Sequence, residues 1–181
     1  SQDYENDIQV CLTVVHFPGK KLLNNIIDSI ITPLKNKFPQ HYYYERDNMH
    51  MTIKNIRTIN NPPDFTQEDI KKAEKIFSTV LKKHKSFNVY FYRLLLFKNN
   101  LALVGTSDSE LDSLILDLDG ELKSQGVPDN KTYINKDHFF VNITLARFKK
   151  DYDDNFSETI DKLSNQIKFE TYEINSVTLL T

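Results

Sequence analysis

The sequence of 181 residues has no tryptophan, one cysteine, four glycines and a formal charge of only −2. Cys11 is the single thiol, which excludes an intramolecular disulfide and favours a reducing, cytoplasmic location. The near-neutral charge excludes a broad basic face, so any phosphate site has to be local. No apolar run approaches the roughly 18 residues of a membrane span, and the acidic N-terminus does not resemble a secretory signal. We therefore expect a cytoplasmic protein without a membrane partner.

What remains is an ordinary globular composition. Apolar residues make up 39% and charged residues 27% of the chain, and twelve Phe and nine Tyr supply bulk in place of tryptophan. These proportions are typical of globular domains. The sequence has neither a low-complexity segment nor an obvious linker, so we expect one domain over residues 1–181. We also expect a monomer, because no large apolar stripe remains outside the core faces of the helices.

Strand and helix patterns alternate along the chain. Runs rich in β-branched and aromatic residues predict strands at 8–15, 48–56, 87–97, 101–104, 139–148 and within 169–180. Apolar residues at helical spacing predict helices at 22–34, 66–81, 107–122 and 156–167. We expect Thr66 and Ser107 to cap two of these helices, and Pro33 to kink or shorten the first one. The pair Asn99-Asn100 favours a hairpin, which indicates an α+β fold with antiparallel sheet.

Two short strings in the expected strands resemble each other. They are His50-Met51-Thr52-Ile53 and Asn142-Ile143-Thr144-Leu145. Side chains two apart on a strand share a face, about 6.6 Å from each other, so four polar groups converge if the two strands lie near each other. Two hydroxyls can hold phosphate oxygens while an imidazole moves a proton near neutral pH, which suits phosphodiester chemistry. A single His-x-Thr is common by chance, and in isolation it would more often be an ordinary surface or half-buried site.

Together with their context, these strings resemble the 2H (two-histidine) phosphoesterase superfamily, which includes the RNA 2′,3′-cyclic phosphodiesterases also called 2′-5′ RNA ligases. The first motif is His50-Met51-Thr52-Ile53. The second lies in the segment from Phe139 to Arg147, whose trailing Leu-Ala-Arg is close to the family pattern. An opening strand and helix, a central helix and hairpin, and a final strand after a helix follow the family's order over nearly the whole chain.

The resemblance implies a bilobal fold with a pseudo-two-fold axis, antiparallel sheets around a central cleft and helices on the outside. It also implies catalysis without a metal or another cofactor. One His activates water, the other protonates the leaving oxygen, and two Ser or Thr hydroxyls hold the phosphate. By position, His50 is the first catalytic residue, and Thr52 and Thr144 bind the phosphate. The implied substrate is RNA or a nucleotide with a 2′,3′-cyclic phosphate or a 2′-5′ linkage.

Asn142 departs from the family pattern, in which this position is the second His. Its amide can hydrogen-bond a phosphate oxygen but cannot carry a proton in the relevant pH range. Because a positioned acid or base contributes roughly 10²–10⁴-fold to a rate, the chain is either a slow phosphodiesterase or a pseudo-enzyme that binds nucleotide or RNA ends without turnover. A third interpretation is that Asn142 replaces a histidine of the natural protein. His138, about 13 Å away on a regular strand, is too distant to substitute.

Three further residues are candidates for substrate binding, each with a plainer alternative. Phe140 shares the face of Asn142, and Tyr133 precedes the second motif, so either ring could stack on a base. Aromatic residues in strands are more often part of the core. Lys54 is expected on the face of His50, where it could approach an anion, although a solvated lysine at a strand end is the simpler interpretation.

Arg147 is the last candidate for substrate binding. It stands at odd spacing from Thr144, so on a straight strand it points to the opposite face. A salt bridge on the outside and a role in phosphate or rim contacts are both open at this position. We expect His16 in a loop, and His41 and His84 on the surface.

Overall fold

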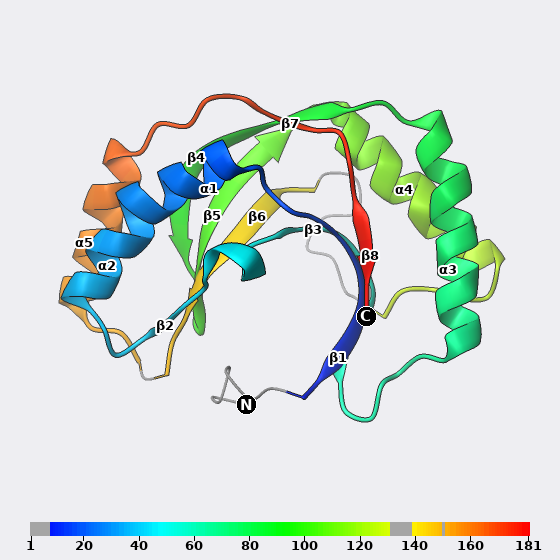
Figure 1. Ribbon diagram of the computed structural model, residues 1–181, viewed down its shortest axis with the longest axis horizontal. Coiled ribbons are helices and arrows are strands. Elements are labelled where there is room, and N and C mark those ends of the chain that lie inside the picture. Colours follow the sequence, from blue (N-terminus) through cyan, green and yellow to red (C-terminus); the bar gives the residue numbers. More distant parts are fainter. Residues whose placement is uncertain (1–7, 131–138, 150) are drawn as a thin grey trace.

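The computed structural model describes residues 8–130, 139–149 and 151–181 of the chain. Within these ranges eight strands form one sheet (Figure 1) in the order β7-β4-β5-β6-β3-β1-β8, with the short β2 paired to β6. The strands are β1 (Val10–His16), β2 (Tyr42–Tyr43), β3 (Met51–Asn60), β4 (Phe87–Leu96), β5 (Asn100–Ser107), β6 (Val141–Arg147), β7 (Tyr172–Ile174) and β8 (Thr178–Leu180). Every strand pair is antiparallel, which confirms the predicted α+β class.

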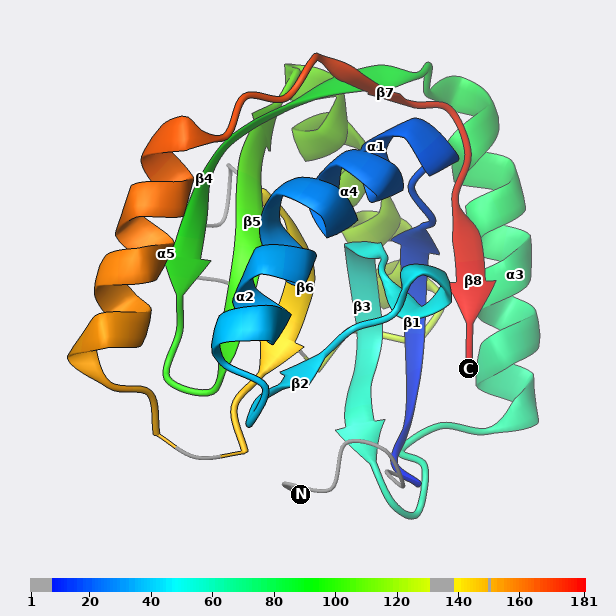
Figure 2. The same cartoon turned by 60° about the vertical axis from the view of Figure 1, so that its left-hand side comes forward.

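The helices form two groups with the curled sheet between them (Figures 1 and 2). The first group contains α1 (Lys20–Ile26), the π-helical turn η1 (Ile27–Ile31), α2 (Thr32–Lys37) and α5 (Asp154–Gln166). The second contains α3 (Gln67–Val80), the 3₁₀ turn η3 (Leu81–Lys83) and α4 (Ser109–Ser124), and a further 3₁₀ turn, η2 (Arg46–Asn48), precedes β3. Lys37 Nζ joins α2 to α5 through bonds to Asn155 Oδ1 at 3.2 Å and Thr159 Oγ1 at 2.9 Å.

The apolar stripe of the first helix is buried as predicted, but Pro33 does not shorten this helix. The stripe consists of Leu22, Leu23, Ile26, Ile30, Ile31 and Leu34. Pro33 stands in the first turn of α2, directly after the π-helical turn. There the N–H of Thr32 bonds to the carbonyl of Ile27, five residues back. The extra residue in this turn changes the hydrogen-bond register just before Pro33, so the missing N–H of Pro33 is tolerated.

Thr66 caps α3 as predicted. Its hydroxyl accepts the N–H of Asp69, and the Asp69 carboxylate accepts the N–H of Thr66, so two backbone donors are satisfied reciprocally. A glycine ends α4. Gly126, just after the last turn of this helix, has φ +73°, which a residue with a side chain adopts only with strain. The N–H groups of Gly126 and Val127 bond back to the carbonyls of Lys123 and Leu122, which closes the helix.

The predicted cap at Ser107 is wrong. Ser107 is the last residue of β5, and Asp108 occupies the N-cap position of α4. The Asp108 carboxylate does not cap the helix, because it accepts the backbone N–H of Asn88 on β4 at 2.9 Å. Glu110, which stands three residues after Ser107 and would complete a capping box there, instead accepts from His84 Nδ1 at 2.9 Å. Tertiary contacts to β4 and the preceding turn thus take the carboxylates that the local pattern assigns to the helix.

The expected final strand is divided in two. β7 pairs with β4 at one edge of the sheet, and β8 pairs with β1 at the other edge. Between them, residues 175–177 cross from one half of the sheet to the other (Figure 1). The C-terminal segment therefore supplies both edge strands of the sheet.

A buried histidine attaches this crossing segment to the end of β1. His16 Nδ1 lies 2.7 Å from the carbonyl of Ser176, and Nε2 lies 2.8 Å from the hydroxyl of Tyr172. A carbonyl only accepts, so Nδ1 carries the proton and Nε2 of the neutral ring accepts from the Tyr172 hydroxyl. That hydroxyl oxygen accepts the N–H of Gly19 at 2.9 Å. The expectation that His16 is a loop residue is therefore wrong, and its neutral form completes the network.

His41 and His84 also differ from the expected surface positions. His41 is buried, with its ring 5.0 Å from the rings of Phe148 and Phe156, and within the described residues neither ring nitrogen has a hydrogen-bond partner. The His84 side chain is largely buried between Glu110 and Asp117, which it contacts at 2.9 and 3.2 Å. Their polar sequence surroundings gave no sign of these tertiary contacts.

We predict that the free energy of unfolding decreases as the pH falls below about 6.5, the ordinary histidine pKa. Burial lowers the pKa of His16, against the bond to Ser176, and burial also lowers the pKa of His41. Below the ordinary value the unfolded state therefore binds protons that the folded state does not, at a cost of at most about 1.36 kcal/mol per site and pH unit. Denaturant titrations of the wild type and His16→Asn between pH 7.5 and 5 should give a smaller slope for the variant, even if it is less stable throughout. An identical slope would contradict the prediction, and His41→Phe provides a second comparison.

Candidate active site

The two motifs lie on neighbouring antiparallel strands, β3 and β6, where Met51 is the Cα partner of Ile143. Antiparallel pairing then sets His50 opposite Thr144, and Thr52 opposite Asn142. Side chains directly opposite have Cβ atoms about 5 Å apart, and diagonal neighbours about 7–8 Å. The four polar side chains are half-buried, whereas Met51 and Ile143 are fully buried on the other face. We call the polar side of this pair the motif face.

Each motif contains a β-bulge directly after its threonine. On β3, Thr52 pairs with Val15 and Lys54 with Val14, so Ile53 is the extra residue. On β6, Thr144 pairs with Ala102 and Ala146 with Leu101, so Leu145 is the extra residue. A bulge of this kind shifts the alternation of side chains by one position. The two bulges stand at the same place in the two motifs, which supports a pseudo-two-fold relation between them.

The first bulge turns Lys54 away from the motif face, so the expectation that it shares the face of His50 is wrong. Lys54 is only 1% exposed. Its ammonium group contacts Asp119 of α4 at 3.3 Å and also bonds to Asp129. A lysine buried this deeply between two carboxylates joins the motif strand to the helix layer. It is not placed to approach an anion on the motif face.

The second bulge has the opposite effect on Arg147. This residue pairs with Asn100, two positions from Ala102, the partner of Thr144, so Arg147 returns to the face of Thr144. Its Nε donates to the Tyr44 hydroxyl at 3.4 Å. The straight-strand expectation that Arg147 points to the opposite face is therefore wrong. A guanidinium group on the motif face can reach an anion there.

Asn55 occupies on β3 the position that Arg147 has on β6, three residues after the motif threonine. Sequence reasoning missed it, because only the matching bulges bring it back to the motif face. Asn55 pairs with Thr13 of β1, and its Oδ1 accepts the Thr13 hydroxyl at 2.9 Å. Aligning the two motifs on their threonines would have placed Asn55 and Arg147 at equivalent positions, and this equivalence could have identified Asn55.

His50 begins the first motif and is half-buried. Its Nδ1 lies 3.0 Å from the carbonyl of Asn48, so in the neutral ring this nitrogen carries the proton and Nε2 carries the lone pair. The ring of Phe17 stands 6.3 Å from that of His50 at a steep angle. Fixing one ring nitrogen by a backbone bond orients the other as a base.

Of the two aromatic candidates, only Phe140 lies among the described residues. Phe140, directly before β6, is 46% exposed. Tyr133 lies outside the described residues, as does His138.

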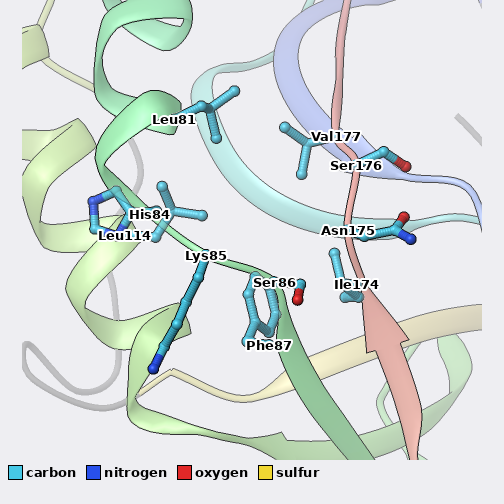
Figure 3. Close-up of a pocket in the computed structure, with 10 residues that line it drawn as sticks. All are labelled: Leu81, His84, Lys85, Ser86, Phe87, Leu114, Ile174, Asn175, Ser176 and Val177. Carbon is cyan, nitrogen blue, oxygen red and sulfur yellow. The ribbon is translucent and has the colours of Figure 1, made fainter.

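Two pockets lie apart from the motif residues. The first, of 320 Å³, lies between the end of α3, α4 and the crossing segment 175–177 (Figure 3); it includes His84, Lys85 and Ser176. The second, of 520 Å³, lies between the start of α1 and the segment before β7, where Lys21 pairs with Glu170 at 2.5 Å.

Membrane and metal features are limited in the described part of the chain. No helix there combines the length and apolar character needed to cross a membrane. Within the same residues, His, Cys, Asp and Glu side chains form no group of three or more that could hold a metal ion.

We predict that Lys54→Ala lowers the free energy of unfolding by about 3–5 kcal/mol, because it leaves two carboxylates facing a buried gap without their cation. Lys72→Ala is a matched control, since its pair with Glu68 on α3 is exposed and such a pair contributes no more than about 1 kcal/mol. Urea titrations of the two variants measure the difference. Equal effects would show that the Lys54 bridge does not anchor β3.

The fold is shared with solved structures of low sequence identity. The PDE domain of MHV ns2 is 10% identical, with a TM-score of 0.57 over 94% of this chain and 97% of that one. E. coli LigT in its apo form is 13% identical, with a TM-score of 0.58 over 94% of this chain and 86% of LigT. TT0787 of Thermus thermophilus is 9% identical, with a TM-score of 0.56 over 94% and 84% of the two chains. LigT has also been solved with ATP, at a TM-score of 0.54 and 14% identity over 96% of this chain and 84% of that one.

Comparisons with models of protein families and with curated proteins give no match. The structural likeness nevertheless extends over almost the whole chain, from β1 to β8. It agrees with the curled antiparallel sheet and the helices described above. The chain has the fold of the 2H phosphoesterase superfamily.

Proposed function

We propose that the protein is a phosphodiesterase that acts on RNA or nucleotides with a 2′,3′-cyclic phosphate or a 2′-5′ linkage. The observation that carries this proposal is the Met51–Ile143 pairing, which gathers one histidine, one asparagine and two threonines on one face. The names of two structural neighbours, a PDE domain and LigT in complex with ATP, agree with phosphodiester and nucleotide chemistry on this fold.

In the proposed reaction the phosphate lies between the two motifs. Thr52, Thr144 and the amide N–H groups of Asn142 donate hydrogen bonds to its non-bridging oxygens. His50 Nε2 takes a proton from water, the water oxygen bonds to phosphorus, and the bond from phosphorus to one ribose oxygen breaks. The leaving oxygen takes its proton from a second water molecule, because Asn142 has no acidic proton to give. The hydroxide left behind takes the proton from His50 Nε2, which restores the neutral imidazole. No step requires a metal ion, so a chelator should not change the rate.

We predict that Asn142→His increases the rate on a 2′,3′-cyclic mononucleotide by roughly 10²–10⁴-fold, because it restores a general acid. His50→Ala should lose activity by a factor of the same order, since it removes the base. Rates of the wild type and both variants, measured with purified protein and EDTA, test this. The catalytic proposal fails if His50→Ala leaves the rate unchanged and Asn142→His does not increase it. Tight binding without product in all three proteins would instead identify a pseudo-enzyme.

We also predict that Thr52→Val and Thr144→Val each weaken phosphate binding by roughly 10- to 150-fold, the range for one hydrogen bond to a charged group. Valine keeps the shape of threonine without its hydroxyl. Thr52→Ser and Thr144→Ser are the controls and should retain most of the affinity. Calorimetry with a non-hydrolysed nucleotide monophosphate measures the loss, and equal affinity of the Val and Ser variants would exclude the hydroxyl contacts.

A further inference from the structure

The motif face continues across the sheet onto β4, which the catalytic proposal does not use. Asn142 of β6 pairs with Val104 of β5, and Val104 pairs with Arg93 of β4. Paired residues share a face, so Arg93 stands in line with Asn142, two strands or about 10 Å away. Further along the same two strands, Tyr90 pairs with Thr106 on the same face. The β4 side of the motif face therefore carries a cation and an aromatic ring.

A bulge on β4 adds a second ring to this surface. Phe91 pairs with Gly105 and Arg93 with Val104, so Tyr92 is the extra residue. Tyr92 is 55% exposed, Tyr90 43% and Phe140 46%, and Arg93 is exposed. We call Tyr90, Tyr92, Arg93 and Phe140 the aromatic wall. Large exposed rings beside a polar site are characteristic of a surface that binds a partner.

The ring of Tyr90 is held in place. Its hydroxyl donates to Asp108 Oδ1 at 3.0 Å, and Asp108 Oδ2 accepts the backbone N–H of Asn88 at 2.9 Å. The hydroxyl is thus engaged at the edge of the ring, and the flat face remains available for stacking.

The opposite side of the motif face is different. There Thr13 of β1 pairs with Leu180 of β8, and Val15 pairs with Thr178. These four side chains carry neither a ring nor a charge. On that side the described residues offer one exposed ring, Phe17 beside His50, whereas toward β4 a ligand that extends beyond the phosphate position meets several exposed rings together with the cation of Arg93.

We propose that the aromatic wall binds single-stranded RNA that continues from the scissile phosphate toward β4. Bases stack on Tyr92 and Phe140, and Arg93 contacts a neighbouring backbone phosphate. Rings that alternate with a cation suit a single strand, because every base has a flat face and every linkage a negative charge. The inference rests on the proposed function and narrows its substrate from nucleotides in general to RNA of several residues.

The test compares a cyclic mononucleotide with a six-residue RNA that ends in the same 2′,3′-cyclic nucleotide. The proteins are the wild type, Tyr92→Ala, Arg93→Gln and, as a control, Leu116→Ala, which removes an exposed side chain on α4. For the hexamer, Tyr92→Ala should raise KM by roughly 5- to 150-fold, the range for one stacked base, and leave KM for the mononucleotide unchanged. Leu116→Ala should change neither value.

Binding of a labelled hexamer, measured by fluorescence anisotropy across a salt series, tests the wall independently of turnover. Arg93→Gln should reduce the slope of log affinity against log salt by about 0.7, the value for one phosphate contact in a single strand. If the proposed function is wrong, neither substrate gives product. The anisotropy measurement then still shows whether the aromatic wall binds RNA. The wall proposal is overturned if the variants bind and process the hexamer like the wild type, or if a protein partner but no RNA binds there.

Discussion

The structure depends on one strand pairing, that of β3 with β6 through Met51 and Ile143. Both side chains are 0% exposed and belong to the hydrophobic core. Because side chains alternate along a strand, burying these two residues forces their neighbours onto the other face. A slip of one residue would place two polar groups in the core and two large apolar groups in solvent. The hydrophobic effect that stabilises the centre of the sheet therefore also gathers the four polar side chains of the candidate site.

Much of this arrangement could be predicted from periodicity alone. The helical stripes, the cap at Thr66 and the common face of His50 and Thr52 follow from local spacing. Lys54 and Arg147 were misplaced for one shared reason, because spacing arguments assume straight strands and each motif contains a bulge. The cap expected at Ser107 is absent because Ser107 still belongs to β5, one residue before the N-cap position, and Glu110 bonds to His84 instead. Bulges and tertiary hydrogen bonds involve pairing partners distant in the chain, which a local pattern does not contain.

Asn142 shows how the fold and the chemistry are separated at this site. Its side chain projects from the motif face, while the buried face of β6 supplies the core contacts of that strand. A change from an ionisable to a neutral polar group there costs no packing and leaves no buried charge unpaired. The polar group that we propose to contact the phosphate and the packing of the sheet thus lie on different sides of the same strand. In contrast, Lys54 lies on the buried side, where loss of its charge would destabilise the fold by leaving Asp119 and Asp129 without their cation.

The division of the C-terminal strand has a consequence for the order of folding. β8 pairs with β1, the first strand of the described chain, and β7 pairs with the far edge formed by β4. During synthesis both edges remain unpaired until residues 172–180 have emerged, long after the motif strands are complete. Unpaired edges are templates for association with other chains, and contacts this distant in sequence form slowly. Until these residues arrive, the nascent chain therefore exposes the edges of β4 and β1 to association with other chains.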